Sequence, residues 1–138
     1  MNRVIIDSGP LAAYFCENDQ WFDWVRETLR SFPAPLFTCE AVITEAAFLI
    51  GRYGGRPEVL LSLITAGPLK IGFDIAREAG ELEVLLKRYR SVPVSLADAC
   101  LIRMSETMPN CSLLTTDSDF RIYRRFGRQV IPLIAPWG

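Results

Sequence analysis

Four acidic residues stand alone in apolar parts of the sequence: Asp7, Glu45, Asp98 and Asp117. No other charged residue lies within three positions of the first three, and Asp117 directly follows the run LLTT. An ionised carboxylate beside a hydrophobic core is unfavourable by several kcal/mol unless a counter-charge neutralises it. No basic side chain lies within a helical turn of Glu45 or Asp98. The neutralising charge must therefore come from elsewhere in the fold or from a bound cation.

Histidine is absent from the chain. Its absence excludes Ser-His-Asp and Cys-His catalysis, imidazole acid–base chemistry and zinc–histidine sites. Acid–base or metal chemistry must then use carboxylates, and hard oxygen ligands without histidine or thiolate select Mg²⁺ or Mn²⁺.

Two of the four acids follow predicted β-strands. Asp7 comes after the β-branched run at 4–6, and Asp117 comes after the apolar run at 112–115. Open α/β sheets place their sites at the carboxyl ends of parallel strands. These two carboxylates are therefore expected at the same edge of a sheet.

The other two acids lie on predicted helices. Glu45 is inside a largely apolar helix over 40–53, and Asp98 is on a helix that Ser95 caps and that runs to about 104. If both helices pack with their acids toward the strand ends, four carboxylates share one pocket. Like charges at short range cannot all stay ionised without a cation, so the pattern predicts a divalent metal site.

Each acid also has an ordinary structural interpretation. Asp98 stands three residues after a serine, which is the spacing of a capping box. Asp7 suits a turn or a helix N-cap, and Asp117 and Asp119 suit the first turn of a helix. Glu45 caps nothing, and a salt bridge to a distant arginine is its best alternative. The joint pattern, more than any single acid, favours the metal site.

Short apolar strands that alternate with helices predict a three-layer α/β/α sandwich with a short-stranded, mainly parallel central sheet. With 138 residues, we expect one domain over 1–138. The expected strands are 4–6, 36–38, 69–71, 112–115 and 130–134. The first helix is expected to begin at Pro10, and Asn18 or Asp19 is expected to cap the second. The remaining helices are expected to begin at 40, 57, 74, 95 and 117.

Three further expectations concern particular residues. Pro10 is predicted to start the first helix, and the strand 130–134 is placed at a sheet edge because Pro132 is tolerated there. The helix over 74–89 is expected to bury one stripe: Ile75, Ala79, Leu82, Leu86 and Tyr89.

Composition narrows the class of protein. The net charge is −1, with 15 basic and 16 acidic residues. This balance argues against a protein that binds duplex nucleic acid through a broad basic surface. No apolar run reaches the ~18 residues of a membrane span. The start of the chain lacks the features of a signal peptide, so we expect a cytoplasmic protein. The four cysteines include no CxxC pair and are expected to be small core residues.

Taken in order, VIIDSGPL, ITEAAFLI, SLADACLI and LLTTDSDF resemble the four acidic motifs of PIN-domain nucleases, especially the VapC-like toxins. The four acids are separated by 38, 53 and 19 positions, which suits that family. The resemblance spans essentially the whole chain. It assigns Asp7, Glu45, Asp98 and Asp117 to the acidic quartet, as catalytic residues and metal ligands. The accessory positions that match the family are Asp119, Ser8 and Thr115.

The resemblance implies a Mg²⁺-dependent or Mn²⁺-dependent endoribonuclease that leaves a 5′-phosphate. It also implies a small antitoxin as partner and a homodimer. Arg121, Arg124 and Arg125 are our hypothetical phosphate contacts, although a solvated helix face explains this cluster about as well. A transfer-RNA loop, a ribosomal-RNA loop and messenger RNA all stay open as substrates.

Two alternatives keep the same fold: a catalytically silent PIN-like binding module, and a PIN nuclease for RNA processing unrelated to toxin–antitoxin function. A phosphotransfer receiver fits poorly, because the first strand is followed by no acidic pair and no lysine stands late in the chain. An aspartyl-phosphate phosphatase fits poorly, because its second aspartate would stand where Gly9 does.

Overall fold

The computed structural model describes residues 2–137. Its central sheet has the strand order β3-β2-β1-β4-β7, and each neighbouring pair is parallel. The strands are β1 (Arg3–Ile6), β2 (Leu36–Thr38), β3 (Leu69–Ile71), β4 (Cys111–Leu114) and β7 (Leu133–Ile134). β1 lies at the centre, so Asp7 leaves the sheet at the middle of its carboxyl edge.

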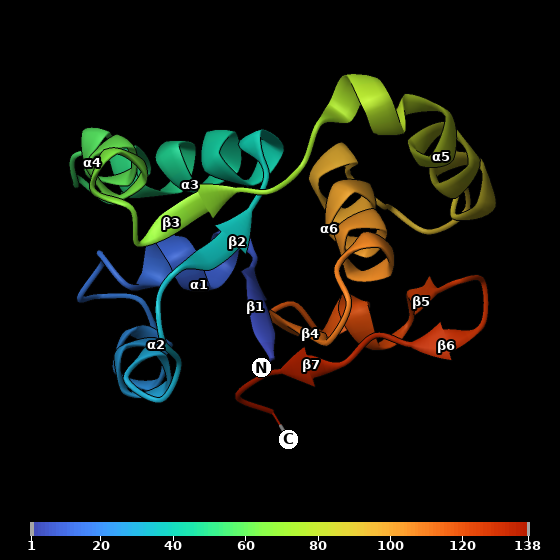
Figure 1. Cartoon of the computed structure of the whole chain (residues 1–138). Helices are drawn as coiled ribbons and strands as arrows, with labels where there is room; N and C mark the ends of the chain where they lie inside the picture. Colours follow the sequence, from blue (N-terminus) through green and yellow to red (C-terminus); the bar gives the residue numbers. More distant parts are fainter. Residues whose placement is uncertain (1, 138) are drawn as a thin grey trace.

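Helices connect successive strands. They are α1 (Ser8–Ala13), α2 (Phe22–Leu29), α3 (Glu40–Arg52), α4 (Glu58–Ala66), α5 (Ile75–Arg88) and α6 (Leu96–Thr107). The chain moves outward from β1 to β3 and then returns to β4, so right-handed crossovers put α1–α4 on one face and α5 and α6 on the other. Figure 1 shows α1–α4 to the left of β1 and α5 and α6 to its right. The expected three-layer sandwich is confirmed.

After β4 the chain forms a 3₁₀-helix, η1 (Ser118–Arg121), and then an antiparallel pair, β5 (Arg124–Arg125) and β6 (Gln129–Val130). None of the helices within 2–137 is long and apolar enough to cross a membrane.

The core is densest where β1 and β4 pair. Ile5, Ile6, Leu113 and Leu114 are fully buried, because both faces of a central parallel strand are covered by helices. The Thr38 hydroxyl donates to the Ile6 carbonyl at 2.9 Å, which ties the end of β2 to the end of β1 just before Asp7. All four cysteines are reduced and buried, as expected.

The first helix begins earlier than predicted. α1 starts at Ser8, not Pro10, because Asp7 takes the N-cap position and accepts the Ser8 N–H at 2.6 Å. Pro10 lies inside the first turn, where its missing N–H has no partner to lose.

The predicted cap of the second helix is wrong. α2 starts after Trp21 and has no side-chain cap. Asp19 instead accepts the Trp21 N–H at 2.8 Å, in the turn before the helix. A short polar side chain that bonds to the backbone two residues on favours a turn over a helix start.

The predicted apolar stripe of α5 is partly wrong. Leu82 and Leu85 are buried, whereas Ile75 and Leu86 are exposed by 46% and 36%. Ala79 is also exposed. The reason is that α5 packs chiefly against α6, so only a narrow strip of its surface is covered.

The predicted last strand is two strands. Gln129–Val130 is β6 and pairs with β5, whereas Leu133–Ile134 is β7 and pairs with β4 at the sheet edge. Pro132 separates them, because it has no N–H with which to continue a ladder. Its carbonyl nevertheless accepts the Leu113 N–H at 2.8 Å.

Replacing a central core residue tests this packing. We expect Leu113→Ala to lower the free energy of unfolding by about 3 kcal/mol, because it leaves a cavity in the central strand pair. The matched control is Leu61→Ala on α4, where the leucine is 59% exposed and the change should be about 0.5 kcal/mol or less. Urea denaturation measures both, and equal losses would contradict the placement of β4.

Candidate functional site

Asp7 is held by hydrogen bonds from the start of α1 and from the residue after β4. The residue is only 5% exposed. Oδ1 accepts the Ser8 N–H at 2.6 Å, and Oδ2 accepts the Thr115 hydroxyl at 2.7 Å. Because Ser8 starts α1 and Thr115 directly follows β4, these two bonds fix the carboxylate at the carboxyl edge of the sheet.

Glu45 reaches this edge from α3. The Ser8 hydroxyl donates to Glu45 Oε1 at 3.0 Å and lies 3.4 Å from Asp7 Oδ1, so one hydroxyl bridges two carboxylates that are 38 positions apart. α1 packs along α3, which makes the bridge possible. The alternative of a salt bridge is not borne out, because no ion pair found within residues 2–137 includes Glu45.

Asp98 is the third residue of α6. It forms the expected capping box with Ser95: Asp98 Oδ2 accepts the Ser95 N–H at 3.2 Å, and the Ser95 hydroxyl accepts the Asp98 N–H at 3.0 Å. The Tyr123 hydroxyl donates to the same Oδ2 at 3.4 Å. Within the described part of the chain, Asp98 Oδ1 receives no hydrogen bond, so it is available to a ligand.

Asp117 caps η1. Its Oδ1 accepts the Asp119 N–H at 2.9 Å, and its own N–H donates to the Thr115 hydroxyl at 3.0 Å. Thr115 therefore connects Asp117 to Asp7, because its hydroxyl accepts from one residue and donates to the other. Asp119 lies in the first turn of η1, as the ordinary interpretation of this residue expected.

Gly9 permits this arrangement. A Cβ atom at this position would lie 2.5 Å from the Thr116 hydroxyl oxygen. Glycine is thus required where the start of α1 approaches the segment after β4.

We call Asp7, Glu45, Asp98 and Asp117 the acid cluster. Burial, together with the nearby Asp98 and Asp117 carboxylates, raises the pKa of Asp7 from 3.8 to about 6, against the opposing effect of the Thr115 and Ser8 hydrogen bonds. Burial, together with Asp117 and Glu45, also raises the pKa of Asp98. The fold thus brings all four carboxylates within electrostatic reach of one another.

None of the ion pairs found in residues 2–137 includes a member of the acid cluster. Hydrogen bonds from hydroxyls and N–H groups supply partial charge only. The repulsion between the carboxylates can therefore be relieved by taking up a proton, as the raised pKa of Asp7 indicates, or by binding a cation.

The donor set fits a hard divalent cation. Within 2–137 no group of three or more Asp, Glu or Cys side chains is placed so that it could hold a metal ion. Mg²⁺ can be held by one or two carboxylates together with several waters. Asp7 and Asp98 lie close enough for their charges to interact, and carboxylate oxygens are the ligands that Mg²⁺ prefers.

The three predicted phosphate contacts have different surroundings. The Arg121 guanidinium stacks on Trp137, with 4.6 Å between its carbon and the ring centre. Arg124 Nη1 donates to three backbone carbonyls, so that nitrogen is occupied. Arg125 lies over Phe126, and its buried Nε has no partner within the described residues. Arg121 is the most exposed of the three.

Sequence reasoning missed Tyr123. The side chain is fully buried, and its hydroxyl contacts Asp98. Burial and the carboxylates of Asp98, Asp119 and Asp117 raise its pKa, so it stays a hydrogen-bond donor. Its surroundings in the sequence, RIYRRF, resemble a basic surface segment, and nothing in that pattern indicates contact with an acid.

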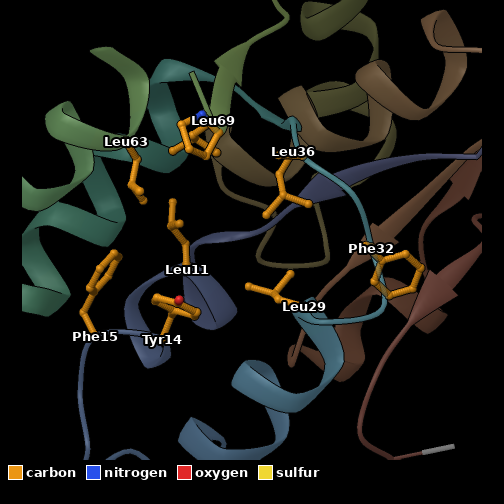
Figure 2. Close-up of a pocket in the computed structure, with 10 residues that line it drawn as sticks. Leu11, Tyr14, Phe15, Leu29, Phe32, Leu36, Leu63 and Leu69 are labelled. Carbon is orange, nitrogen blue, oxygen red and sulfur yellow. The ribbon is translucent and has the colours of Figure 1, made fainter. Parts of the chain in front are cut away.

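An apolar cavity of about 180 Å³ lies away from the acid cluster. Figure 2 shows Leu11 at its middle, with Leu63 and Leu69 on one side and Leu29 on the other. None of its lining residues is charged, so this cavity offers nothing that could bind a phosphate group.

The raised pKa of Asp7 predicts a pH-dependent stability. An unfolded aspartate titrates near 3.9, so between about pH 4 and 6 the folded, metal-free protein holds a proton that the unfolded chain has lost. The free energy of unfolding therefore falls as pH rises through this window. Asp7→Asn removes the effect, and its stability relative to wild type is expected to rise by about 2 kcal/mol between pH 4 and 7.

Urea denaturation with a chelator present measures this difference. Asp23→Asn, at an exposed position on α2, is the matched control and should track wild type at each pH. A constant gap between Asp7→Asn and wild type would contradict the proposed burial of an ionised Asp7.

Comparison with known proteins places the chain in a family and finds a similar solved structure. The family model for the PIN domain matches residues 4–125. Among solved structures, the chain is similar to Mycobacterium tuberculosis VapC20, described as a toxin that cleaves the sarcin–ricin loop. The TM-score is 0.76 and the sequence identity 19%, over 94% of this chain and 99% of that one. A search of the curated proteins found no match.

Identity this low establishes a shared fold alone. The family match establishes more than a shared fold, because it covers most of the chain, from β1 to β5. This range contains every member of the acid cluster. The chain belongs to the PIN domain family.

Proposed function

We propose that the chain, as a single nuclease domain over 1–138, is an endoribonuclease that hydrolyses RNA phosphodiester bonds with Mg²⁺ or Mn²⁺ at the acid cluster. The observation that carries this proposal is the continuous set of hydrogen bonds from Glu45 through Ser8 and Asp7 to Thr115. It joins carboxylates from separate elements without any counter-cation. Membership of the PIN domain family supports the same conclusion.

The four members of the acid cluster would form two pairs with different roles. Asp7 and Asp98 would hold the ion, and Glu45 and Asp117 would complete its surroundings directly or through water. When bound, the ion would lower the pKa of a water and stabilise negative charge on the phosphate and the leaving 3′ oxygen. Thr115 and Ser8 orient the Asp7 carboxylate, so that little reorganisation is needed at the moment of reaction.

The surroundings of the acid cluster suit a flexible single strand. The cluster lies at a sheet edge, and the neighbouring segment from η1 to β6 carries exposed Arg121 and Arg128. Arginine binds phosphate oxygens through its planar fork, whereas the net charge of −1 offers no broad basic surface for a duplex. We therefore propose a single-stranded or loop RNA as the substrate and a 5′-phosphate as the product end.

The likeness to VapC20 supports a role as the toxin of a toxin–antitoxin pair. In this role the chain would act in the cytoplasm as a homodimer, and a small antitoxin would cover the acid cluster.

Removing one charge from the acid cluster tests the proposal. We expect Asp7→Asn and Asp98→Asn each to slow the cleavage of a single-stranded RNA at least 100-fold in Mg²⁺, because a neutral amide is a poor ligand for a hard cation. Each variant should fold, since an amide oxygen can still accept the capping hydrogen bonds. Asp23→Asn should cleave at the wild-type rate. Wild-type cleavage by either cluster variant would overturn the assigned roles.

Metal binding can be measured without any substrate. Mn²⁺ at about 100 times its Kd should stabilise the wild type by about 2.7 kcal/mol, because it binds the folded state only. The rise in Tm should disappear on adding a chelator and should be absent in Asp7→Asn. If millimolar Mn²⁺ does not shift the Tm of the wild type, the chain is a metal-free binding module.

A further inference from the structure

Two cysteines that are far apart in the sequence share one cavity beside the acid cluster. Cys39 lies between β2 and α3, and Cys100 lies on α6. Both line the same cavity of about 40 Å³, together with Phe73 and Ile75. Both are free thiols, and each is only 1% exposed. The fold therefore holds a pair of facing thiols that the proposed hydrolysis does not use.

Cys39 is placed to be the reactive member of the pair. It occupies the N-cap position of α3, a helix of 13 residues. The adjacent Cys100 thiol holds the pKa of Cys39 below its ordinary value, although burial opposes this, and the same contact together with burial holds the pKa of Cys100 above its ordinary value. The thiolate is the nucleophilic form of cysteine, and helix N-termini favour it.

The other two cysteines lack these features. Cys111 donates to the Ser105 carbonyl at 3.6 Å, and burial raises its pKa. Burial also raises the pKa of Cys16, with a contribution from Asp19. Neither lines the cavity that Cys39 and Cys100 share. They are internal controls, because they are almost as buried as the pair.

We propose that Cys39 and Cys100 are an oxidation site, at which hydrogen peroxide converts the two thiols into a disulfide that links α3 to α6. The Cys39 thiolate attacks one peroxide oxygen and becomes a sulfenic acid, and the other oxygen leaves as water once protonated. The Cys100 sulfur then attacks the Cys39 sulfur, the S–S bond forms, and a second water leaves. Two thiols lose two electrons and two protons in total, and the peroxide accepts them.

The position of the link connects it to the acid cluster. α3 carries Glu45, and Cys100 lies two residues after Asp98. An S–S bond of about 2.0 Å is shorter than any hydrogen-bonded contact between thiols, so the start of α3 must move toward the first turns of α6. A shift of this kind displaces Asp98 from Asp7. Because misplacement by about 1 Å can slow a reaction 100-fold, we expect the oxidised protein to cleave RNA at least 10-fold more slowly; this effect rests on the proposed function.

Peptide mapping after peroxide treatment tests the oxidation site without reference to activity. In the full wild-type chain, we expect a linked pair of peptides that contain Cys39 and Cys100, and a fall from four free thiols to two. Dithiothreitol should restore all four. The proposal is overturned if Cys16 or Cys111 is oxidised while the pair stays reduced, or if the pair is oxidised to sulfinic acids without a link.

Cleavage assays on the same samples test the connection to the acid cluster. Peroxide should slow the wild type, and dithiothreitol should restore its rate. Cys39→Ala should keep its rate in peroxide, whereas Cys111→Ala should lose activity as the wild type does. A mapped disulfide with an unchanged rate overturns the connection but not the oxidation site. If untreated protein cleaves no RNA, the proposed function fails, while the peptide map still decides whether the disulfide forms.

Discussion

The arrangement depends on one buried charge. Asp7 sits at the end of the central strand, is almost fully enclosed, and has two hydrogen-bond donors but no basic partner within the described residues. The surrounding structure follows from the need to hold it: Thr115 ends the neighbouring strand with a hydroxyl, Ser8 opens the next helix with another, and Gly9 allows the two segments to approach. Burial makes the ionised form of such a carboxylate unfavourable, which the raised pKa of Asp7 reflects.

Much of this could be predicted from the sequence, because the strongest signals are local. Short β-branched runs that end in acids predict both the strands and the edge at which Asp7 and Asp117 emerge. The spacing of Ser95 and Asp98 predicts a capping box, which the structure contains. Two interpretations of one acid can hold together, since Asp98 caps its helix through one oxygen and leaves the other free.

The features that sequence reasoning missed depend on tertiary contact. The exposed side of α5 follows from its resting on a single neighbouring helix, which no periodicity in its own residues reveals. The contact of Tyr123 with Asp98 and the facing thiols of Cys39 and Cys100 join positions 25 and 61 residues apart. In these cases the residue type permits several roles, and only the packing of other elements selects one.

The acid cluster can form only after β1 has paired with β4. Ile6 of β1 aligns with Leu114 of β4, so one of the two strands that pair with β1 lies more than 100 residues later in the chain. During synthesis, Asp7 emerges from the ribosome early and stays without Thr115 until more than 100 further residues have followed. A nascent chain that lacks β4 therefore has no assembled acid cluster.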